Sequence, residues 1–265
     1  MQETSDIRII DSHAMRDKLS KDPSGSWCAR PKIGRLVQLI KGFYGGELTV
    51  ITGPTKNGKT LFAQTLTHHF AMDEIKCLWF SYEVPARQFL EQFGDNLPIF
   101  WLPEQLKAKD INWVYRAIKT AVQDPTVKIV FIDHLHFLFD ILQSGNPSLH
   151  IGGIVRSLKG IAKEQDVHIF LIAHMGKVGK DKDGKWRDPE AGDTRDSSFI
   201  EQECDNTLAI WRGRESKVNA KLKIIHNRRF GVFDEVIMLT KQGPYLTELP
   251  EGHTEPQETK KWSEA

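Results

Sequence analysis

The segment Gly53–Thr60 reads GPTKNGKT and matches the phosphate-binding pattern G-x-x-x-x-G-K-[ST]. An apolar run typical of a buried strand, Leu48–Thr52, precedes it, and a helical pattern, Lys59–Met72, begins within it. In such a strand–loop–helix unit the glycines let the backbone curl, so that N–H groups and the helix N-terminus point at phosphate oxygens. The sequence therefore predicts nucleotide contacts from Gly53, Pro54, Thr55, Lys56, Asn57, Gly58, Lys59, Thr60 and Leu61.

Two side chains of this loop have expected partners. Lys59 should neutralise the β- and γ-phosphates of ATP or another nucleoside triphosphate, and Thr60 should ligate Mg²⁺. The alternative is a chance glycine turn ahead of a helix. The complete motif between a strand and a helix argues against that alternative.

The rest of the chain predicts an α/β fold. Between residues 32 and 248 short apolar runs alternate with helical patterns, as in a mostly parallel central sheet flanked by helices. The last two runs have no long helix between them, so we expect an antiparallel C-terminal extension. The predicted strands are Leu48–Thr52, Cys77–Ser81, Ile129–Ile132, His168–Ala173, Thr207–Trp211, Ala220–Ile225 and Val236–Thr240. The predicted helices are Lys59–Met72, Ile111–Val122 and Leu149–Gln165.

We divide the chain into three parts. Residues 1–30 read as an arm with a short polar helix around Ile9–Leu19 that begins near Asp11, followed by a linker-like stretch. Residues 31–249 form the α/β domain, and residues 250–265 read as a polar, disordered tail.

Composition limits the cellular compartments in which this protein is expected. No apolar run approaches the length of a membrane span, so we expect no membrane partner. The mixed charge of the first 30 residues argues against a secretory signal or a transit peptide. The cysteines Cys28, Cys77 and Cys204 form no zinc or disulfide pattern, which favours a reducing compartment. We therefore expect the cytoplasm of a bacterial, archaeal or phage-infected cell rather than an organelle matrix.

Three polar residues follow predicted strands and should meet the phosphate loop at one rim of the sheet, beyond the carboxyl ends of its strands. Asp133 fits a carboxylate directed at Mg²⁺, and its alternative is a cap of a strand–helix turn. Glu83 could polarise the attacking water, or it could simply begin a helix ahead of Pro85. His174 could report the state of the γ-phosphate, or it could be a structural histidine.

Two basic segments could contact a phosphate backbone or a nucleotide. Gly176–Arg187 is rich in glycine and lysine and contains Lys177 and Lys180, which suits contact with nucleic acid. Its alternative is an exposed charged loop, because aspartates dilute the charge. Arg228 and Arg229 end a predicted strand and could act as an arginine finger on a neighbouring subunit, or they could be solvated residues of a turn.

These segments together resemble the RecA-like motor domain of hexameric replicative DNA helicases, in particular the Twinkle and phage primase-helicase branch, with DnaB near it. The resemblance covers about Ile33 to Leu249. It rests on KGFYGGELTVITGPTKNGKT, LWFSYEVP, IVFIDHLHFL, IFLIAHMGK, GDTRDSSFIEQECDNTLAIWR and KIIHNRRFGVF.

The resemblance implies a role for each motif. Glu83 falls where the family has its catalytic base, and His174 where a strand-end residue senses phosphate. The DNA-contacting loop falls at Arg195, Asp196 and Ser198, with the lysine-rich stretch as its flank. The family's Lys-x-Arg appears in an ungapped match as Asn227-Arg228-Arg229, which makes Arg229 the finger, whereas a one-residue shift selects Arg228.

The hypothesis from sequence is a ring, expected to be a hexamer, that hydrolyses ATP and translocates on single-stranded DNA. Each nucleotide would lie between two copies, and a primase or polymerase could accompany the ring. The arm helix resembles the linker helix that docks on a neighbouring subunit. The same motifs allow two alternatives, a recombinase that forms filaments on single strands and a nucleotide-switched scaffold ATPase.

Overall fold

The computed structural model describes residues 9–22, 27–138, 147–175, 189–190, 193, 200, 202–212 and 219–250. Its strands are β1 (Cys28–Ala29), β2 (Phe43–Tyr44), β3 (Leu48–Thr52), β4 (Lys76–Ser81), β5 (Val127–Asp133), β6 (His168–Ile172), β7 (Asn206–Trp211), β8 (Asn219–Asn227), β9 (Val232–Gln242) and β10 (Tyr245–Glu248). Its α-helices are α1 (Ser12–Lys21), α2 (Gly34–Ile40), α3 (Lys59–Ala71), α4 (Ala86–Glu91), α5 (Ile111–Ala121) and α6 (Pro147–Gln165).

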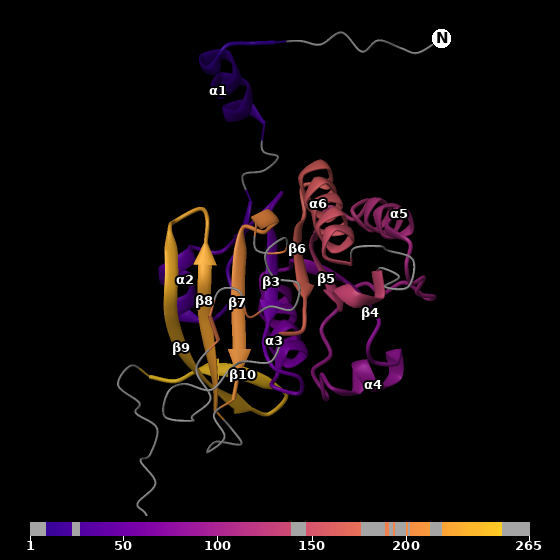
Figure 1. The fold of residues 1–265 in the computed structure, drawn as a ribbon, viewed down its shortest axis with the longest axis vertical. Coiled ribbons are helices and arrows are strands. Elements are labelled where there is room, and N and C mark those ends of the chain that lie inside the picture. Colours follow the sequence, from indigo (N-terminus) through magenta and orange to yellow (C-terminus); the bar gives the residue numbers. More distant parts are fainter. Residues whose placement is uncertain are drawn as a thin grey trace, which may run out of the picture.

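The main sheet has eight strands in the order β10-β9-β8-β7-β3-β6-β5-β4 (Figure 1). The strands from β7 to β4 are parallel to one another, whereas β8, β9 and β10 add to β7 as antiparallel neighbours. The predicted fold class, a mostly parallel sheet with an antiparallel C-terminal extension, is confirmed. Because β8 runs opposite to β7, β8 ends on the side of the sheet at which β3 begins.

Two apolar cores lie on the two faces of the sheet, since successive strand residues point to opposite sides. Phe131 of β5 stacks on Trp79 and Phe170 with ring centroids 4.5 and 4.7 Å away, in the core that α2, α3 and α4 cover. Its neighbours Val130 and Ile132 enter the other core, which α5 and α6 cover. Burial on both faces explains why these strands read as continuous apolar runs.

The N-terminal segment differs in part from its prediction. Helix α1 begins after Asp11, whose carboxylate accepts hydrogen bonds from the backbone N–H of His13 and Ala14 at 2.9 Å, so the predicted start is correct. Strand β1, which lies within the predicted arm, pairs with β2, and Ala29 is buried in the core. Packed structure therefore begins ahead of residue 31.

The predicted tail falls outside the described residues from 251 onward. Among the described helices none combines the length and the apolar character that a membrane span requires.

Candidate nucleotide-binding site

The loop between β3 and α3 is shaped by two glycines with positive φ. Gly53 has a φ of 148°, and a Cβ there would lie 2.0 Å from the carbonyl oxygen of Ile210. Close approach of β7 thus requires glycine at this position. Gly58 has a φ of 100° and directly precedes α3, which begins at Lys59 as predicted. The N-terminus of α3 therefore opens at the end of a buried strand, where a phosphate would meet unpaired backbone N–H groups.

Lys59 is held inside this loop. Its Nζ donates hydrogen bonds to the carbonyl oxygens of Gly53 and Pro54, both at 3.0 Å. Only 5% of the residue is exposed, and this burial lowers the pKa of Lys59, while the nearby carboxylates of Asp133 and Glu83 act in the opposite direction. A largely desolvated ammonium interacts strongly with an anion, because little water competes for it.

Thr60 and Asp133 meet at the end of β5. The Thr60 hydroxyl donates to Asp133 Oδ2 at 2.7 Å. Asp133 is 1% exposed, and burial raises its pKa to about 6 despite the hydrogen bond from Thr60. Its other oxygen, Oδ1, is buried and has no hydrogen-bond partner among the described residues.

This pair fits a magnesium ion. A threonine hydroxyl and an aspartate carboxylate are oxygen ligands of the kind that Mg²⁺ selects, directly or through its water shell. The buried Oδ1 of Asp133 can accept a hydrogen bond from such a water. When bound, Mg²⁺ would neutralise charge that develops on the phosphates.

Glu83, His134 and His174 form a cluster beside this pair. The Nδ1 of His134 lies 3.3 Å from Glu83 Oε2, and its ring packs edge-on against His174 with centroids 4.4 Å apart. His134 is 8% exposed, whereas the Glu83 side chain is 42% exposed. The carboxylate therefore reaches solvent, where it can contact a water, while His134 beside it is buried.

The structure thus brings the three predicted polar residues and the phosphate loop together at one rim, because their strands end side by side. Asp133 pairs with Ser81 on one side and with Ile172 on the other, and Met175 N donates to Gly53 O at 3.3 Å. Two further residues at this rim were not predicted. His134 follows Asp133 directly, and Arg212 follows β7, with its backbone N donating to Asn57 Oδ1 at 3.0 Å. Position at the end of a parallel strand was the available signal for both.

Arg228 and Arg229 lie at the other end of the strands, on the side of the sheet opposite the phosphate loop. β8 ends at Asn227, which pairs with Asn206, and Asn206 pairs with Thr49 at the start of β3. The phosphate loop follows the other end of β3. In Figure 1 β7 and β8 accordingly point in opposite directions. The two arginines therefore face away from the phosphate loop of their own chain.

Each arginine has partners within its own chain. Arg229 Nε donates to Glu47 Oε1 at 2.6 Å, and the guanidinium lies 4.0 Å from the ring centroid of Tyr44. Arg228 Nη2 donates to the carbonyl oxygen of Gln202 at 2.7 Å. The side chains of Arg229 and Arg228 nevertheless remain 44% and 55% exposed, respectively.

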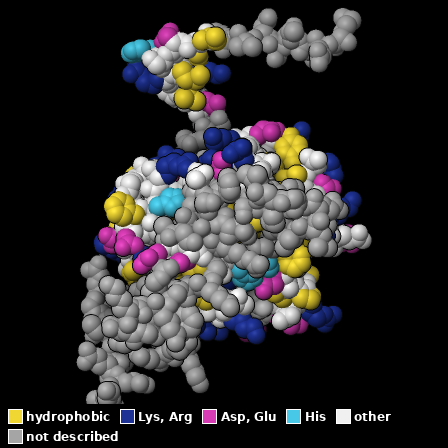
Figure 2. Space-filling model, in the orientation of Figure 1, with side chains coloured by type: hydrophobic (Ala, Val, Ile, Leu, Met, Phe, Trp, Pro, Cys, Tyr) yellow, Lys and Arg dark blue, Asp and Glu magenta, His cyan; other side chains and the backbone are white. Residues whose placement is uncertain are grey.

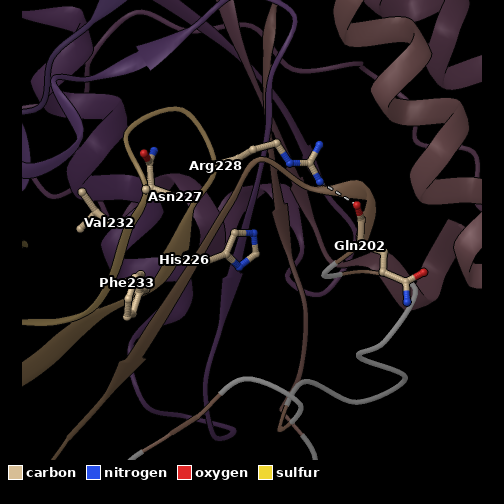
Figure 3. Close-up of a pocket in the computed structure, with 7 residues that line it drawn as sticks. Gln202, His226, Asn227, Arg228, Val232 and Phe233 are labelled. Carbon is tan, nitrogen blue, oxygen red and sulfur yellow. Dashed lines mark hydrogen bonds between the residues drawn. The ribbon is translucent and has the colours of Figure 1, made fainter.

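A cavity of about 490 Å³ opens beside Arg228. Figure 3 shows the Arg228 side chain extending from the end of β8 toward Gln202. The cavity is lined by Gln202, His226, Asn227, Arg228, Gly231, Val232 and Phe233. Phe233, which pairs with His226 across β8 and β9, is 72% exposed. On the face drawn in Figure 2, Lys and Arg side chains gather along the same side of the sheet, below α1.

The residues predicted to contact DNA fall outside the described part of the chain. These are Lys177, Lys180, Arg195, Asp196 and Ser198. Their roles stay predictions.

The chain is similar to known proteins in sequence and in fold. The family model described as "AAA domain" matches residues 29–180. The chain is 31% identical to a probable plasmid replicative DNA helicase of Chlamydia muridarum, over 72% of this chain and 48% of that protein. It is 25% identical to the replicative DNA helicase DnaB of Haemophilus influenzae, over 77% of this chain and 48% of that protein. The chain therefore spans about half the length of these two relatives.

Two solved structures share the fold. One is a DnaB-like replicative helicase, described with its interactions with primase, which aligns over 92% of this chain and 68% of its own length. The other is a separately solved ATPase domain, which aligns over 90% of this chain and 97% of its own length. Both have a TM-score of 0.72 and 17% sequence identity. The domain thus has the RecA-like fold of helicase ATPase domains, as the resemblance implies.

Proposed function

The chain belongs to the AAA domain family, and from this premise we propose that it is the ATP-hydrolysing motor of a replicative-type DNA helicase, which forms a ring and translocates on single-stranded DNA. The helicase relatives and the fold support the class of enzyme. Single-stranded DNA, the ring and its expected six copies are parts of the proposal.

One observation carries the proposal: the phosphate loop and the arginine turn, the two proposed halves of a hydrolysis site, lie at opposite ends of the strands of the same sheet. Thr60 and Asp133 are in contact at one end, and the turn with Arg228 and Arg229 lies at the other. A site that contains both halves therefore needs two copies arranged head to tail. Head-to-tail contacts of one kind close into a ring when the rotation between copies permits it.

The chemistry proposed for such a site follows from the residues around the phosphate loop. Lys59 would bind the β- and γ-phosphates, and Thr60 and Asp133 would hold Mg²⁺. Glu83 would orient and deprotonate the attacking water, and His134 beside it would keep the carboxylate in place. His174 contacts His134, so a change at the phosphate could pass to the segment that follows β6.

Arg229 is the proposed finger, with Arg228 as the alternative. Arg229 would exchange its contacts with Glu47 and Tyr44 for the γ-phosphate of the neighbouring copy. Removal of a finger lowers turnover by about 10³- to 10⁵-fold, whereas nucleotide binding by the loop should persist.

ATP hydrolysis with and without single-stranded DNA tests the proposal. We expect DNA to stimulate the wild-type rate, and we expect Arg229→Ala to bind ATP normally but not to turn it over. If Arg228→Ala alone has that effect, Arg228 is the finger. If both variants hydrolyse ATP like the wild type, no arginine of this turn completes the site.

The same assay separates the two alternative functions. Slow hydrolysis that single-stranded DNA does not change would favour a nucleotide-switched scaffold. Electron microscopy of the protein with DNA and ATP would distinguish closed rings from the filaments of a recombinase. A primase is a proposed further partner, because the DnaB-like structure is described with its interactions with primase. A polymerase as partner and a bacterial, archaeal or phage-infected cytoplasm as location stay predictions from the sequence.

A further inference from the structure

A row of buried polar side chains crosses four neighbouring strands and ends at the turn that carries the arginines. His168 of β6 contacts Thr49 of β3, with Nε2 and Oγ1 2.8 Å apart. Thr49 Oγ1 accepts from Asn206 Nδ2 of β7 at 2.9 Å, and Asn206 Oδ1 accepts from Asn227 Nδ2 of β8 at 2.5 Å. None of these four side chains is more than 4% exposed. Polar groups in an apolar core persist only when hydrogen bonds satisfy them.

The hydrogen bonds of this row all run in one direction. His168 Nδ1 lies 2.8 Å from the carbonyl oxygen of Tyr44, which can only accept, so Nδ1 carries the proton. Burial lowers the pKa of His168 to about 4, so its ring is neutral near pH 7 and Nε2 accepts from the Thr49 hydroxyl. That leaves the Thr49 oxygen to accept from Asn206, and the remaining links follow in turn.

The row ends on the backbone of the arginine turn. Asn227 Oδ1 accepts from the backbone N–H of Phe230 at 2.8 Å. The N–H of Arg228 has a separate acceptor, the carbonyl oxygen of Asp205, at 2.8 Å. Asn227 therefore fixes the part of the turn that follows Arg229, whereas Arg228 has its own anchor.

We propose that Asn227 is a positioning residue for Arg229, held by the buried row from His168, so that the guanidinium faces a nucleotide bound by a neighbouring copy. The inference rests on the proposed function. It also accounts for the asparagine at the position where the Lys-x-Arg pattern has a lysine. Asn227 is 4% exposed and acts on the turn from inside the sheet.

The test compares the wild-type chain with Asn227→Ala in the DNA-stimulated ATPase assay. We expect kcat to fall roughly tenfold, because a small misplacement of a catalytic group has effects of that order or larger, while KM for ATP stays unchanged. Hydrogen exchange at the Phe230 amide should become faster. The exposed Asn112 of α5 supplies the matched control, and Asn112→Ala should leave both quantities unchanged.

Two results would overturn the inference. One is a wild-type kcat for Asn227→Ala, and the other is a loss of ATP binding that parallels the loss of kcat. If Asn227→Ala does not fold, Asn227→Asp replaces it, since a protonated carboxyl in this buried place can accept from Phe230 and donate to Asn206 Oδ1 as the amide does. A near-normal kcat for Asn227→Asp then supports the inference, and a kcat as low as that of Arg229→Ala with a protected Phe230 amide contradicts it. If Arg229→Ala itself turns over normally, the proposed function fails instead.

Discussion

At the scale of single residues, Lys59 and Glu83 have different proposed roles in the phosphate site. Lys59 is buried and bound to loop carbonyls, so its ammonium is positioned before any ligand arrives. Glu83 is the exposed member of its cluster, with a histidine behind it. In the proposed function Lys59 binds phosphate and Glu83 meets the attacking water, and each proposed role predicts a different defect when the residue is replaced.

Replacement of Lys59 should abolish hydrolysis through binding. Lys59→Ala removes the charge that would offset the β- and γ-phosphates, so we expect at least about a hundredfold loss of kcat/KM. Fluorescent-nucleotide titration together with steady-state ATPase assays measures both steps. Lys107, which is exposed, provides the control substitution Lys107→Ala. Unchanged ATP affinity and turnover in Lys59→Ala would contradict the assignment of the loop.

Replacement of Glu83 should separate binding from chemistry. Glu83→Gln keeps the shape of the side chain but cannot accept a proton, so kcat should fall by about 10²- to 10⁴-fold while ATP still binds. Single-turnover hydrolysis with a parallel binding titration measures the split. Glu91→Gln, an exposed change in α4, should behave like the wild type. Turnover that survives Glu83→Gln would assign the base to another group.

At the scale of elements, helix α1 presents exposed apolar side chains. Met15 and Leu19 are four residues apart and therefore share a face of the helix, and they are 43% and 56% exposed. None of the residues of α1 is buried. An exposed apolar face of this kind is expected to pack on another surface, and in the proposed ring that surface belongs to the next copy.

A charge on this face should weaken assembly. We predict that Met15→Asp combined with Leu19→Asp lowers the fraction of protein in the ring at a given concentration, because the apolar contact is lost. Sedimentation velocity with ATP and single-stranded DNA measures that fraction. Lys18→Asp, a charge change at another exposed position of the helix, is the control. Equal assembly of the double variant and the wild type would exclude α1 from the interface.

The long elements could be predicted from sequence, and the short ones could not. β3 runs from Leu48 to Thr52 as predicted, because a strand buried on both faces is a continuous apolar run. Strands β1 and β2 are two residues each, and α2 and α4 have seven and six residues, too short for a periodic pattern. Their stability comes from tertiary packing rather than from local preference.

Some residues of the candidate site could likewise be predicted from sequence, and others could not. Lys59, Thr60 and Asp133 could be predicted because a motif or a strand end marks each of them. His134 has no motif of its own, and its contact with Glu83 exists only because β4 and β5 are neighbours. In the sequence Asn227 is notable only because it stands where the Lys-x-Arg pattern has a lysine. The register of β8 against β7 places Asn227 at the end of the buried row of polar side chains.

At the scale of the whole molecule, buried histidines make stability depend on pH. Burial lowers the pKa of His168 and of His69 to about 4, from an ordinary value of 6.5. Between these values the unfolded chain binds protons that the folded chain does not. The free energy of unfolding should therefore decrease as the pH falls from 6.5 to 4, by about 1.4 kcal/mol per pH unit for each histidine.

Comparison of the wild type with His168→Gln isolates the contribution of His168 to this pH dependence. Asp133 changes stability in the opposite direction, because its raised pKa of about 6 means that the folded state binds the extra proton. Urea unfolding of the wild type and of His168→Gln at pH 6.5, 5.5 and 4.5 separates the effects. The variant should be less stable at pH 6.5 and should lose stability less steeply as the pH falls. Parallel pH dependences for the two proteins would show that His168 is not buried as a neutral ring.

In the proposed function this domain, assembled with copies of itself, converts ATP hydrolysis into strand separation. The most direct measurement is unwinding of a forked DNA duplex by the wild-type protein with ATP and Mg²⁺, with Lys59→Ala and Arg229→Ala as parallel reactions. We predict unwinding by the wild type and none by either variant. Assembled rings that neither unwind the fork nor hydrolyse ATP faster with single-stranded DNA would contradict the account.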